Sequence, residues 1–203
     1  AGIKVVAAER YVKTDTSVTA QTLKLLGARP DAVLVAASGT PGALPQKSLR
    51  ERGYQGGIYQ TYGIANREFL RIAGKDAEGA VFAVGPVVVA SQLDPANPIR
   101  AVATDLTQRY EAAYGKDSMS VFAANAWDAS IVLQHALKTA MGTAKPGTVE
   151  FRSALRDALE GTRDVVTSQG VSTMSPNDHV GYDARAAVMV QIKNGAWLSL
   201  IHI

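Results

Sequence analysis

The sequence contains no cysteine, which excludes disulfide bridges, thiolate zinc sites, iron–sulfur centres and a cysteine nucleophile. No apolar run approaches the length needed to span a bilayer. The excess of one charge over the other is also small, because the chain has 21 Lys and Arg residues and 18 Asp and Glu residues. The basic residues form no run of the kind that binds nucleic acid. These absences leave an ordinary globular protein with a mixed, solvated surface.

Metal, nucleotide and nucleophile motifs are missing as well. The three histidines, His135, His179 and His202, show neither His-x-His nor His-x-x-x-His spacing, so we expect structural or solvent-exposed roles and no metal site. The sequence has no dinucleotide fingerprint, no P-loop and no Gly-x-Ser-x-Gly turn. Acidic pairs such as Asp105 and Glu111 have the spacing of surface helix residues. We therefore expect no cofactor, and a ligand binder rather than an enzyme.

Short apolar segments alternate with helical patterns in the first part of the chain. The Val- and Ala-rich segment 3–12 is predicted to be a buried strand, and segment 32–37 (AVLVAA) to be a strand buried on both faces of a parallel sheet. Further strands are predicted at 58–62 and 80–84, with helices between them. This alternation predicts the α/β class, with a doubly wound parallel sheet and right-handed crossovers.

The pattern changes after residue 85, where Pro and Gly are frequent and we expect the chain to cross between lobes. Three helices are then predicted at 98–114, 121–141 and 148–159, but no strand accompanies them. Helices with apolar faces need a sheet to cover. We therefore expect that this sheet lies outside the chain, and that the apolar faces are exposed or covered by another chain.

Both ends of the chain carry further signals. Ala1-Gly2 and the apolar run after it are typical of a helix-to-strand junction, so we expect the chain to begin inside a fold and not with a signal peptide. Towards the other end, residues 165–174 are expected to be extended. Residues 186–193 and 196–200 are predicted as strands joined by a type I′ turn at Asn194-Gly195.

Polar residues come after two of the predicted parallel strands. Ser38 and Gly39 come after segment 32–37, and Tyr62 ends segment 58–62. Ligands of open α/β sheets bind outside the carboxyl ends of the strands. A hydroxyl and free backbone N–H groups beside a helix start favour an anion such as a carboxylate, and a tyrosine offers a ring wall and a donor. Two alternatives stay open: Ser38 only caps the next helix, and Tyr62 only packs.

Eight segments spread over essentially the whole chain carry a resemblance to a known family. They are Arg29-Pro-Asp-Ala-Val-Leu-Val, Leu49-Arg-Glu-Arg-Gly53, Ile72-Ala-Gly-Lys-Asp-Ala-Glu-Gly79, Asp94-Pro-Ala-Asn-Pro, Tyr110-Glu-Ala-Ala-Tyr-Gly, Ala126-Trp-Asp-Ala, Asp178-His179-Val-Gly-Tyr-Asp and Val190-Gln-Ile-Lys-Asn-Gly-Ala-Trp197. In order and spacing these segments resemble the C-terminal part of type I periplasmic binding proteins. The resemblance is to the Leu/Ile/Val-binding class, which serves branched-chain amino-acid ABC importers.

The resemblance implies two α/β lobes joined by three crossing strands, with the ligand in the cleft. Residues 1–88 and 172–203 are then predicted to form the second lobe. Residues 92–168 are predicted to be the helical return segment of the first lobe, whose N-terminal sheet is absent. The implied partners are a small-molecule ligand and a membrane permease, with no nucleic acid. The implied location is the periplasm, and the chain is expected to associate with a second chain or with the missing N-terminal lobe.

The resemblance also implies a ligand site formed by Ser38, Gly39, Tyr62 and Phe122. Ser38 matches a position that commonly holds a ligand-contacting tyrosine, and Phe122 matches an aromatic contact at the start of a first-lobe helix. Tyr62 matches the glutamate that pairs with the ammonium group of an amino-acid ligand. Without that acid an ammonium loses its charge-assisted partner, so we expect an aromatic or aliphatic carboxylate without an α-amino group.

Three alternatives to this function stay open at the level of sequence. The first is a binder of branched-chain amino acids, and the second is a ligand-sensing regulatory module of the same fold. The third is a fragment of an α/β enzyme, which acid and base residues assembled at the strand ends would favour.

Overall fold

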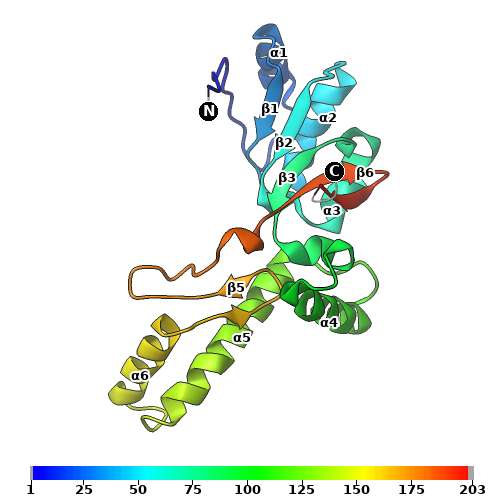
Figure 1. Cartoon of the computed structure of the whole chain (residues 1–203). Helices are drawn as coiled ribbons and strands as arrows, with labels where there is room; N and C mark the ends of the chain where they lie inside the picture. Colours follow the sequence, from blue (N-terminus) through cyan, green and yellow to red (C-terminus); the bar gives the residue numbers. More distant parts are fainter. Residues whose placement is uncertain (1, 201–203) are drawn as a thin grey trace. The chain divides into compact units, whose positions relative to one another are not determined.

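The computed structural model describes residues 2–200. The chain divides into two compact units, called unit 1 (residues 1–83 and 189–203) and unit 2 (residues 84–188) below. Strands and helices alternate along unit 1, whereas unit 2 is mainly helical (Figure 1). His202 lies outside the described residues, so its expected role is not addressed by the structure.

Unit 1 is built on a sheet with the strand order β1-β2-β3-β6-β7. β1 and β2 run parallel with Val35 opposite Gln60, and β2 and β3 are also parallel, which confirms the predicted α/β class. β6 and β7 are antiparallel, and the φ angles of Asn194 and Gly195, 52° and 70°, fit the predicted type I′ turn. The elements are α1 (Thr19–Gly27), β1 (Ala32–Val35), α2 (Ala43–Glu51), β2 (Gly57–Gln60), α3 (Arg67–Ala73), β3 (Val81–Val84), β6 (Val188–Lys193) and β7 (Ala196–Ser199).

The core of unit 1 lies on one face of this sheet. Val33, Val35 and Ile58 point from β1 and β2 onto that face and pack with Leu49 of α2 and with Tyr54. Leu25 and Leu26 of α1 join the same cluster. Alternate residues of a strand point to opposite faces, so one apolar set from each strand is sufficient to hold α1 and α2 against the sheet.

The opposite face of the sheet is open. Leu34 is 66% exposed and Tyr59 is 46% exposed, and Met189 of β6 is exposed as well. The prediction that segment 32–37 is buried on both faces is therefore wrong in this chain, since nothing among the described residues covers Leu34. The strand also stops at Val35, because the Ala37 N–H turns back to the Val35 carbonyl at 3.2 Å.

The predicted buried strand over residues 3–12 is also wrong. These residues are extended but form no strand, and Ile3 and Val5 are 86% and 79% exposed. A strand exists only when its backbone pairs with a neighbour, and within the described chain residues 3–10 make no backbone-to-backbone hydrogen bond. The segment is apolar as the prediction requires, but the partner strand that would bury it is not supplied by the described residues.

Unit 2 consists of three helices and a small hairpin. Asn97, Ser120 and Thr148 accept hydrogen bonds from the first-turn amides of the three helices, so the helices begin where capping residues predict. The predicted helix bounds are confirmed to within one residue. The elements are the short 3₁₀ segment η4 (Pro86–Gln92), α4 (Pro98–Tyr114), α5 (Val121–Met141), α6 (Val149–Glu160), β4 (Val165–Val166) and β5 (Val171–Ser172).

Apolar side chains project from these helices into solvent. Phe122, Leu133 and Met141 on α5 and Val149 on α6 are all exposed. This agrees with the expectation that the helices carry apolar faces which the described chain does not cover.

A buried carboxylate ties the segment after α6 to α5. Asp128 is 3% exposed, and its two oxygens accept the backbone N–H groups of Ser168 and Gln169 at 2.8 and 3.0 Å. The Tyr182 hydroxyl lies 3.4 Å from the same carboxylate. Residues 172–188 belong to unit 2, whereas the predicted boundary assigns residues 172–203 to the second lobe. The assignment of the two units to lobes stays a prediction.

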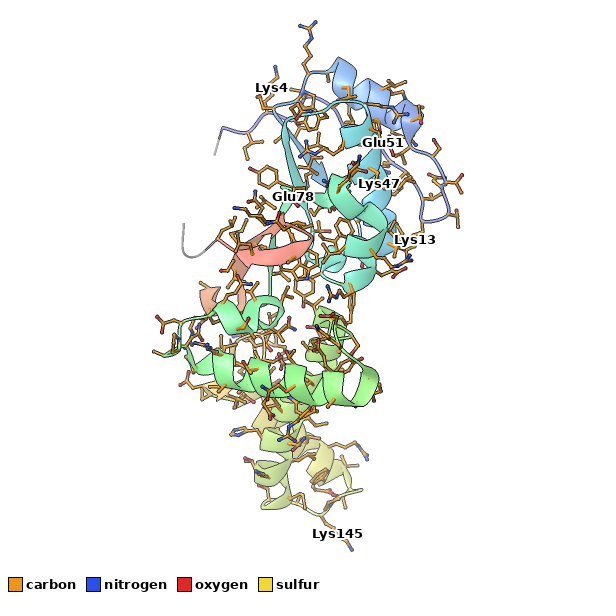
Figure 2. The ribbon with its side chains drawn as sticks, turned by 90° about the vertical axis from the view of Figure 1, so that its right-hand side faces the viewer. Lys4, Lys13, Lys47, Glu51, Glu78 and Lys145 are labelled. Atoms are coloured by element: carbon orange, nitrogen blue, oxygen red, sulfur yellow. The ribbon has the colours of Figure 1, made fainter. Side chains whose placement is uncertain are left out.

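Charged side chains of both signs are spread over the surface. Figure 2 shows Lys4 on the N-terminal segment, Lys47 and Glu51 together on α2, and Lys145 after α5. None of the helices in residues 2–200 is long and apolar enough to cross a membrane.

The Asp128 contacts give a first testable prediction. Replacing Asp128 by Asn puts an amide donor against a backbone N–H, so we expect the unfolding free energy to fall by about 2–4 kcal/mol. Urea denaturation followed by circular dichroism measures this loss. Asp105→Asn, which removes only an exposed ion pair with Arg109, is the matched control and should leave the midpoint unchanged. Equal effects of the two variants would contradict a structural role for Asp128.

A second prediction concerns alkaline pH. Burial raises the pKa of Tyr54. The charge of Arg50 lowers this pKa and that of Asp31 raises it. The Tyr54 hydroxyl donates a hydrogen bond to the Pro30 carbonyl at 3.1 Å. An unfolded tyrosine ionises at about pH 10. Between pH 10 and the higher pKa of the folded state, Tyr54 is ionised in the unfolded chain but remains protonated in the folded chain. The stabilisation is therefore present below pH 10 and is lost as pH rises through the folded pKa. Urea midpoints at pH 8 and 10.5 should therefore differ less for Tyr54→Phe than for the unmodified chain. Parallel losses would refute this assignment.

Candidate ligand-binding site

Two loops meet at the carboxyl edge of the parallel strands in unit 1. Because β1 and β2 are parallel and in register, the residues that come after Val35 and Gln60 emerge side by side. One loop carries Ser38 and Gly39 and leads through the 3₁₀ turn η1 (Thr40–Gly42) into α2. The other carries Tyr62, the first residue of the 3₁₀ turn η2 (Tyr62–Ile64).

Backbone contacts hold the two loops together. The Gly39 N–H donates to the Gly63 carbonyl at 2.8 Å, and the Thr61 hydroxyl donates to the Ala37 carbonyl. A methyl group added at Gly63 would lie 2.7 Å from Cβ and Oγ of Ser38, so only glycine permits this approach. Gly39 has a φ of 67°, which a residue with a side chain rarely adopts. The positions of Ser38 and Tyr62 are thus fixed by glycines in both loops.

Ser38 presents a free hydroxyl at the carboxyl edge of β1. Its side chain is exposed, and its hydroxyl has no hydrogen-bond partner within residues 2–200. The start of α2 lies a few residues further on, and a helix N-terminus favours negative charge.

The four predicted ligand residues fall in different units. Ser38, Gly39 and Tyr62 are brought together in unit 1, and Tyr62 is half-buried beside the Gly39–Gly63 bond. Phe122 is the second residue of α5 in unit 2, directly after the capping residue Ser120 and Val121, and its ring is half-exposed. The structure therefore assembles three of the four residues within one unit.

Two residues near the loops were not singled out from the sequence. The Tyr11 hydroxyl donates to the Pro41 carbonyl at 3.0 Å, and burial raises the pKa of Tyr11. Gln60 is buried at the end of β2. Its side-chain Nε2 donates to Oε1 of Gln46 at 3.0 Å, and its side-chain Oε1 has no hydrogen-bond partner within the described residues. Tyr11 is 30 positions from its partner along the chain, so no local sequence signal predicts the contact.

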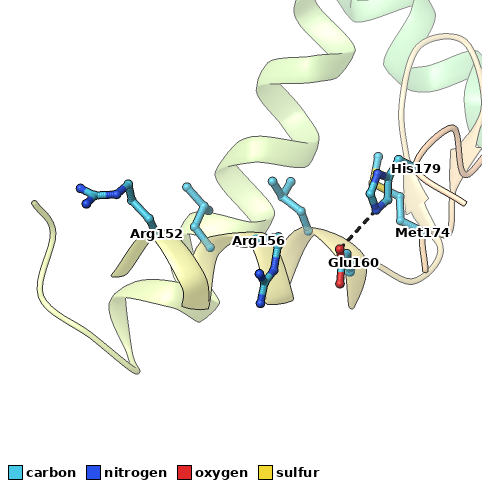
Figure 3. Close-up of a pocket in the computed structure, with 7 residues that line it drawn as sticks. Arg152, Arg156, Glu160, Met174 and His179 are labelled. Atoms are coloured by element: carbon cyan, nitrogen blue, oxygen red, sulfur yellow. Dashed lines mark hydrogen bonds and ion pairs between the residues drawn. The ribbon is translucent and has the colours of Figure 1, made fainter. Parts of the chain in front are cut away.

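A separate cavity of about 470 Å³ lies in unit 2 between α6 and the segment after β5. Figure 3 shows Arg152 and Arg156 on α6, and His179 directed towards Glu160, with 3.2 Å between His179 Nε2 and a Glu160 carboxylate oxygen. Arg156 is also paired, with Asp157. The cavity contains none of the predicted ligand residues, and Arg156 and His179 in its lining each already contact an acidic side chain. The His179 side chain is largely exposed. Within the described residues there is no cluster of three or more His, Asp or Glu suited to a metal ion.

Comparisons with known proteins agree with this architecture. The sequence matches the periplasmic binding protein family over residues 1–196, and no curated protein matches it. A solved structure from Rhodopseudomonas palustris strain CGA009 is 48% identical with a TM-score of 0.94, covering 98% of this chain and 56% of its own. An extracellular ligand-binding receptor from Rhodopseudomonas palustris HaA2 is 47% identical, with a TM-score of 0.94 and the same coverage, 98% and 56%.

A leucine-binding protein (LivK) of Thermotoga maritima is 25% identical, with a TM-score of 0.72, over 93% of this chain and 49% of its own. Of these three relatives, the two Rhodopseudomonas proteins are the more similar to this chain. The chain spans little more than half of their length. The resemblance predicted from the sequence is confirmed by both the family match and the structural neighbours. Because the match extends over residues 1–196, the chain belongs to the periplasmic binding protein family, whose members are ligand-binding receptors.

Proposed function

We propose that this protein is the solute-binding component of an ABC importer, and that its ligand is a small aromatic or aliphatic carboxylate without an α-amino group. The proposed contacts are Ser38, Gly39 and Tyr62 of unit 1 and Phe122 of unit 2, in the cleft between two lobes. One observation carries the proposal: residues 36–42 and 61–66, which form the loops after β1 and β2, contain no Asp or Glu.

The absence of an acid in these loops bears on the amino group of a ligand. An ammonium group that leaves water needs an anionic partner or several strong acceptors, because burying an unpaired charge is costly. Tyr62 stands at the loop position where the family resemblance places a glutamate, and a neutral phenol does not compensate a positive charge. The site therefore disfavours an α-amino acid relative to the same acid without its amino group.

The same loops supply neutral donors for a carboxylate. The Ser38 hydroxyl is exposed and unpartnered in the described chain, and it lies close in sequence to the start of α2. Hydroxyl and backbone N–H donors at a helix start bind anions without a compensating lysine or arginine. The rings of Tyr62 and Phe122 would enclose the apolar part of the ligand.

The proposed partner and location derive from the family. A receptor of this class releases its ligand to a membrane permease, and the lack of cysteine is compatible with the oxidising periplasm. The relative from Rhodopseudomonas palustris HaA2 is described as an extracellular ligand-binding receptor, which supports a location outside the cytoplasm. A ligand-sensing module of the same fold is the alternative, and co-purification with a permease separates the two.

A branched-chain amino-acid binder is the second candidate for the ligand. The likeness to the leucine-binding protein of Thermotoga maritima favours it, but at 25% identity this likeness is much lower than that to the Rhodopseudomonas proteins.

Matched ligand pairs distinguish the two candidates. Isothermal titration of the full-length protein would compare 3-phenylpropanoate with L-phenylalanine, and 4-methylpentanoate with L-leucine, because each pair differs only by the α-amino group. We expect at least one deaminated acid to bind more than tenfold tighter than its amino acid, which corresponds to about 1.4 kcal/mol. Tighter binding of both amino acids would overturn the proposed ligand class and favour the second candidate.

Substitutions in the loops test the named contacts. Ser38→Ala removes one donor to the carboxylate and should weaken binding about 5- to 30-fold, as expected for about 1–2 kcal/mol. Ser153→Ala on α6, also exposed, is the matched control and should leave the affinity unchanged. Tyr62→Glu should reverse the preference within each pair, since it introduces the missing anion. An unchanged preference in Tyr62→Glu would remove Tyr62 from the site.

A further inference from the structure

Side chains from different segments of unit 1 hold the loop that carries Ser38, which consists of residues 36–42. Three backbone carbonyl groups of this loop accept hydrogen bonds from side chains outside it. The donor and acceptor residues are Tyr11 and Pro41, Thr61 and Ala37, and Gln60 and Gly42. Gln60 and Thr61 are consecutive, so one short segment at the end of β2 binds the loop on both sides of Ser38.

Gln60 differs from the other two donors because it is fully buried, with only 4% of its surface exposed. Its Nε2 atom donates to the Gly42 carbonyl at 3.4 Å and to Oε1 of Gln46 at 3.0 Å. Gln46 lies on α2 and is also buried, and its own Nε2 donates to the Asp76 carbonyl at 2.7 Å. The two side-chain amides therefore join the end of β2 to the start of α2 and to the 3₁₀ turn η3 (Gly74–Ala77).

Packing alone does not account for a glutamine at position 60. The Oε1 atom of Gln60 is buried and has no hydrogen-bond partner within the described residues. An unpaired buried acceptor destabilises a fold, and a methionine of similar volume would fill the same space without one. Residues that break the rules of packing in this way occur mainly at functional sites, where another requirement decides the residue. The requirement visible here is the hydrogen bond to Gly42.

The backbone at Gly42 connects this bond to Ser38. A methyl group at Gly42 would lie 2.8 Å from Cγ2 of Ile64, so the first loop lies directly against the second at this point. The Gly42 N–H donates to the Gly39 carbonyl at 3.2 Å, and the Gly39 N–H donates to the second loop at 2.8 Å. Gln60 thus holds one end of a short series of hydrogen bonds, and Ser38 is the residue next to its middle member, Gly39.

We propose that Gln60 is a positioning residue for ligand binding, which holds Ser38 in place against Tyr62 through the backbone of the first loop. Gln46 orients the Gln60 amide for this bond. A site whose groups are fixed before the ligand arrives loses less entropy on binding, so its affinity depends on the bonds that fix it. The role of Ser38 rests on the proposed function, but the positioning of the loop is measurable without a ligand.

Hydrogen exchange at the Gly39 amide of the full-length protein, without ligand, tests the positioning. Gln60→Met keeps the side-chain volume but removes the donor, and should speed exchange at this amide at least tenfold. Thr22→Val is the matched control, because it removes another buried hydrogen bond of unit 1, that between Thr22 and Ser48, outside the two loops. The control should leave exchange at Gly39 within about twofold, even where both variants lose equal stability in urea.

A second variant keeps the test decisive if Gln60→Met does not fold. Gln46→Met leaves Gln60 in place but removes the acceptor that orients its amide, so it should speed exchange at Gly39 in the same direction by a smaller factor. Unchanged exchange at Gly39 in every folded variant of Gln60 and Gln46 would overturn the proposal.

A double-mutant cycle in ligand affinity shows whether Gln60 acts through Ser38. With 3-phenylpropanoate or 4-methylpentanoate, whichever binds more tightly, Gln60→Met should weaken binding about fivefold or more. Adding Ser38→Ala should cause little further loss, because both changes remove the same contact. Fully multiplied effects would show that Gln60 does not act through Ser38, and would overturn the proposal. If neither acid binds, the proposed ligand class fails, whereas exchange at Gly39 still decides the role of Gln60.

Discussion

The in-register parallel pairing of β1 and β2 is the constraint on which unit 1 depends. It places Val33, Val35 and Ile58 on one face, where α1 and α2 can bury them, and it brings the residues after Val35 and Gln60 to the same edge. The loops at that edge are then locked by the hydrogen bond between Gly39 and Gly63. The candidate site is thus a consequence of strand register, and a shift of one residue would move every core side chain to the open face.

Unit 2 relies on a different kind of interaction. Its helices are defined locally by caps, but the segment after α6 contains only two short strands and a 3₁₀ turn. The Asp128 carboxylate attaches this segment to α5 through two backbone N–H groups, which compensate the carboxylate's loss of water. Together with the hydrogen bond between Gln169 and Asn125, these bonds join residues 168 and 169 to α5.

The character of the site depends on the residues that its loops contain. A family that binds amino acids needs both an anion-binding and a cation-binding group, and these loops provide only the first kind. The Ser38 hydroxyl in the loop before α2 is a donor that suits a carboxylate, whereas Tyr62 is neutral where the resemblance places an acid. This difference between two neighbouring loops, rather than the fold, separates the proposed ligand class from branched-chain amino acids.

The sequence by itself determined every element whose signals are local. Asn97, Ser120 and Thr148 mark the helix starts, Asn194-Gly195 marks the hairpin, and the alternation of apolar segments predicts the α/β class and the loops that carry Ser38 and Tyr62. Tertiary structure alone decided whether residues 3–12 pair, which face of β1 is covered, and where residues 172–188 pack. The physical reason is that pairing and burial depend on a partner. Residues 3–10 pair with no strand among residues 2–200, and Asp128 meets Ser168, 40 positions further along, only once the chain has folded back.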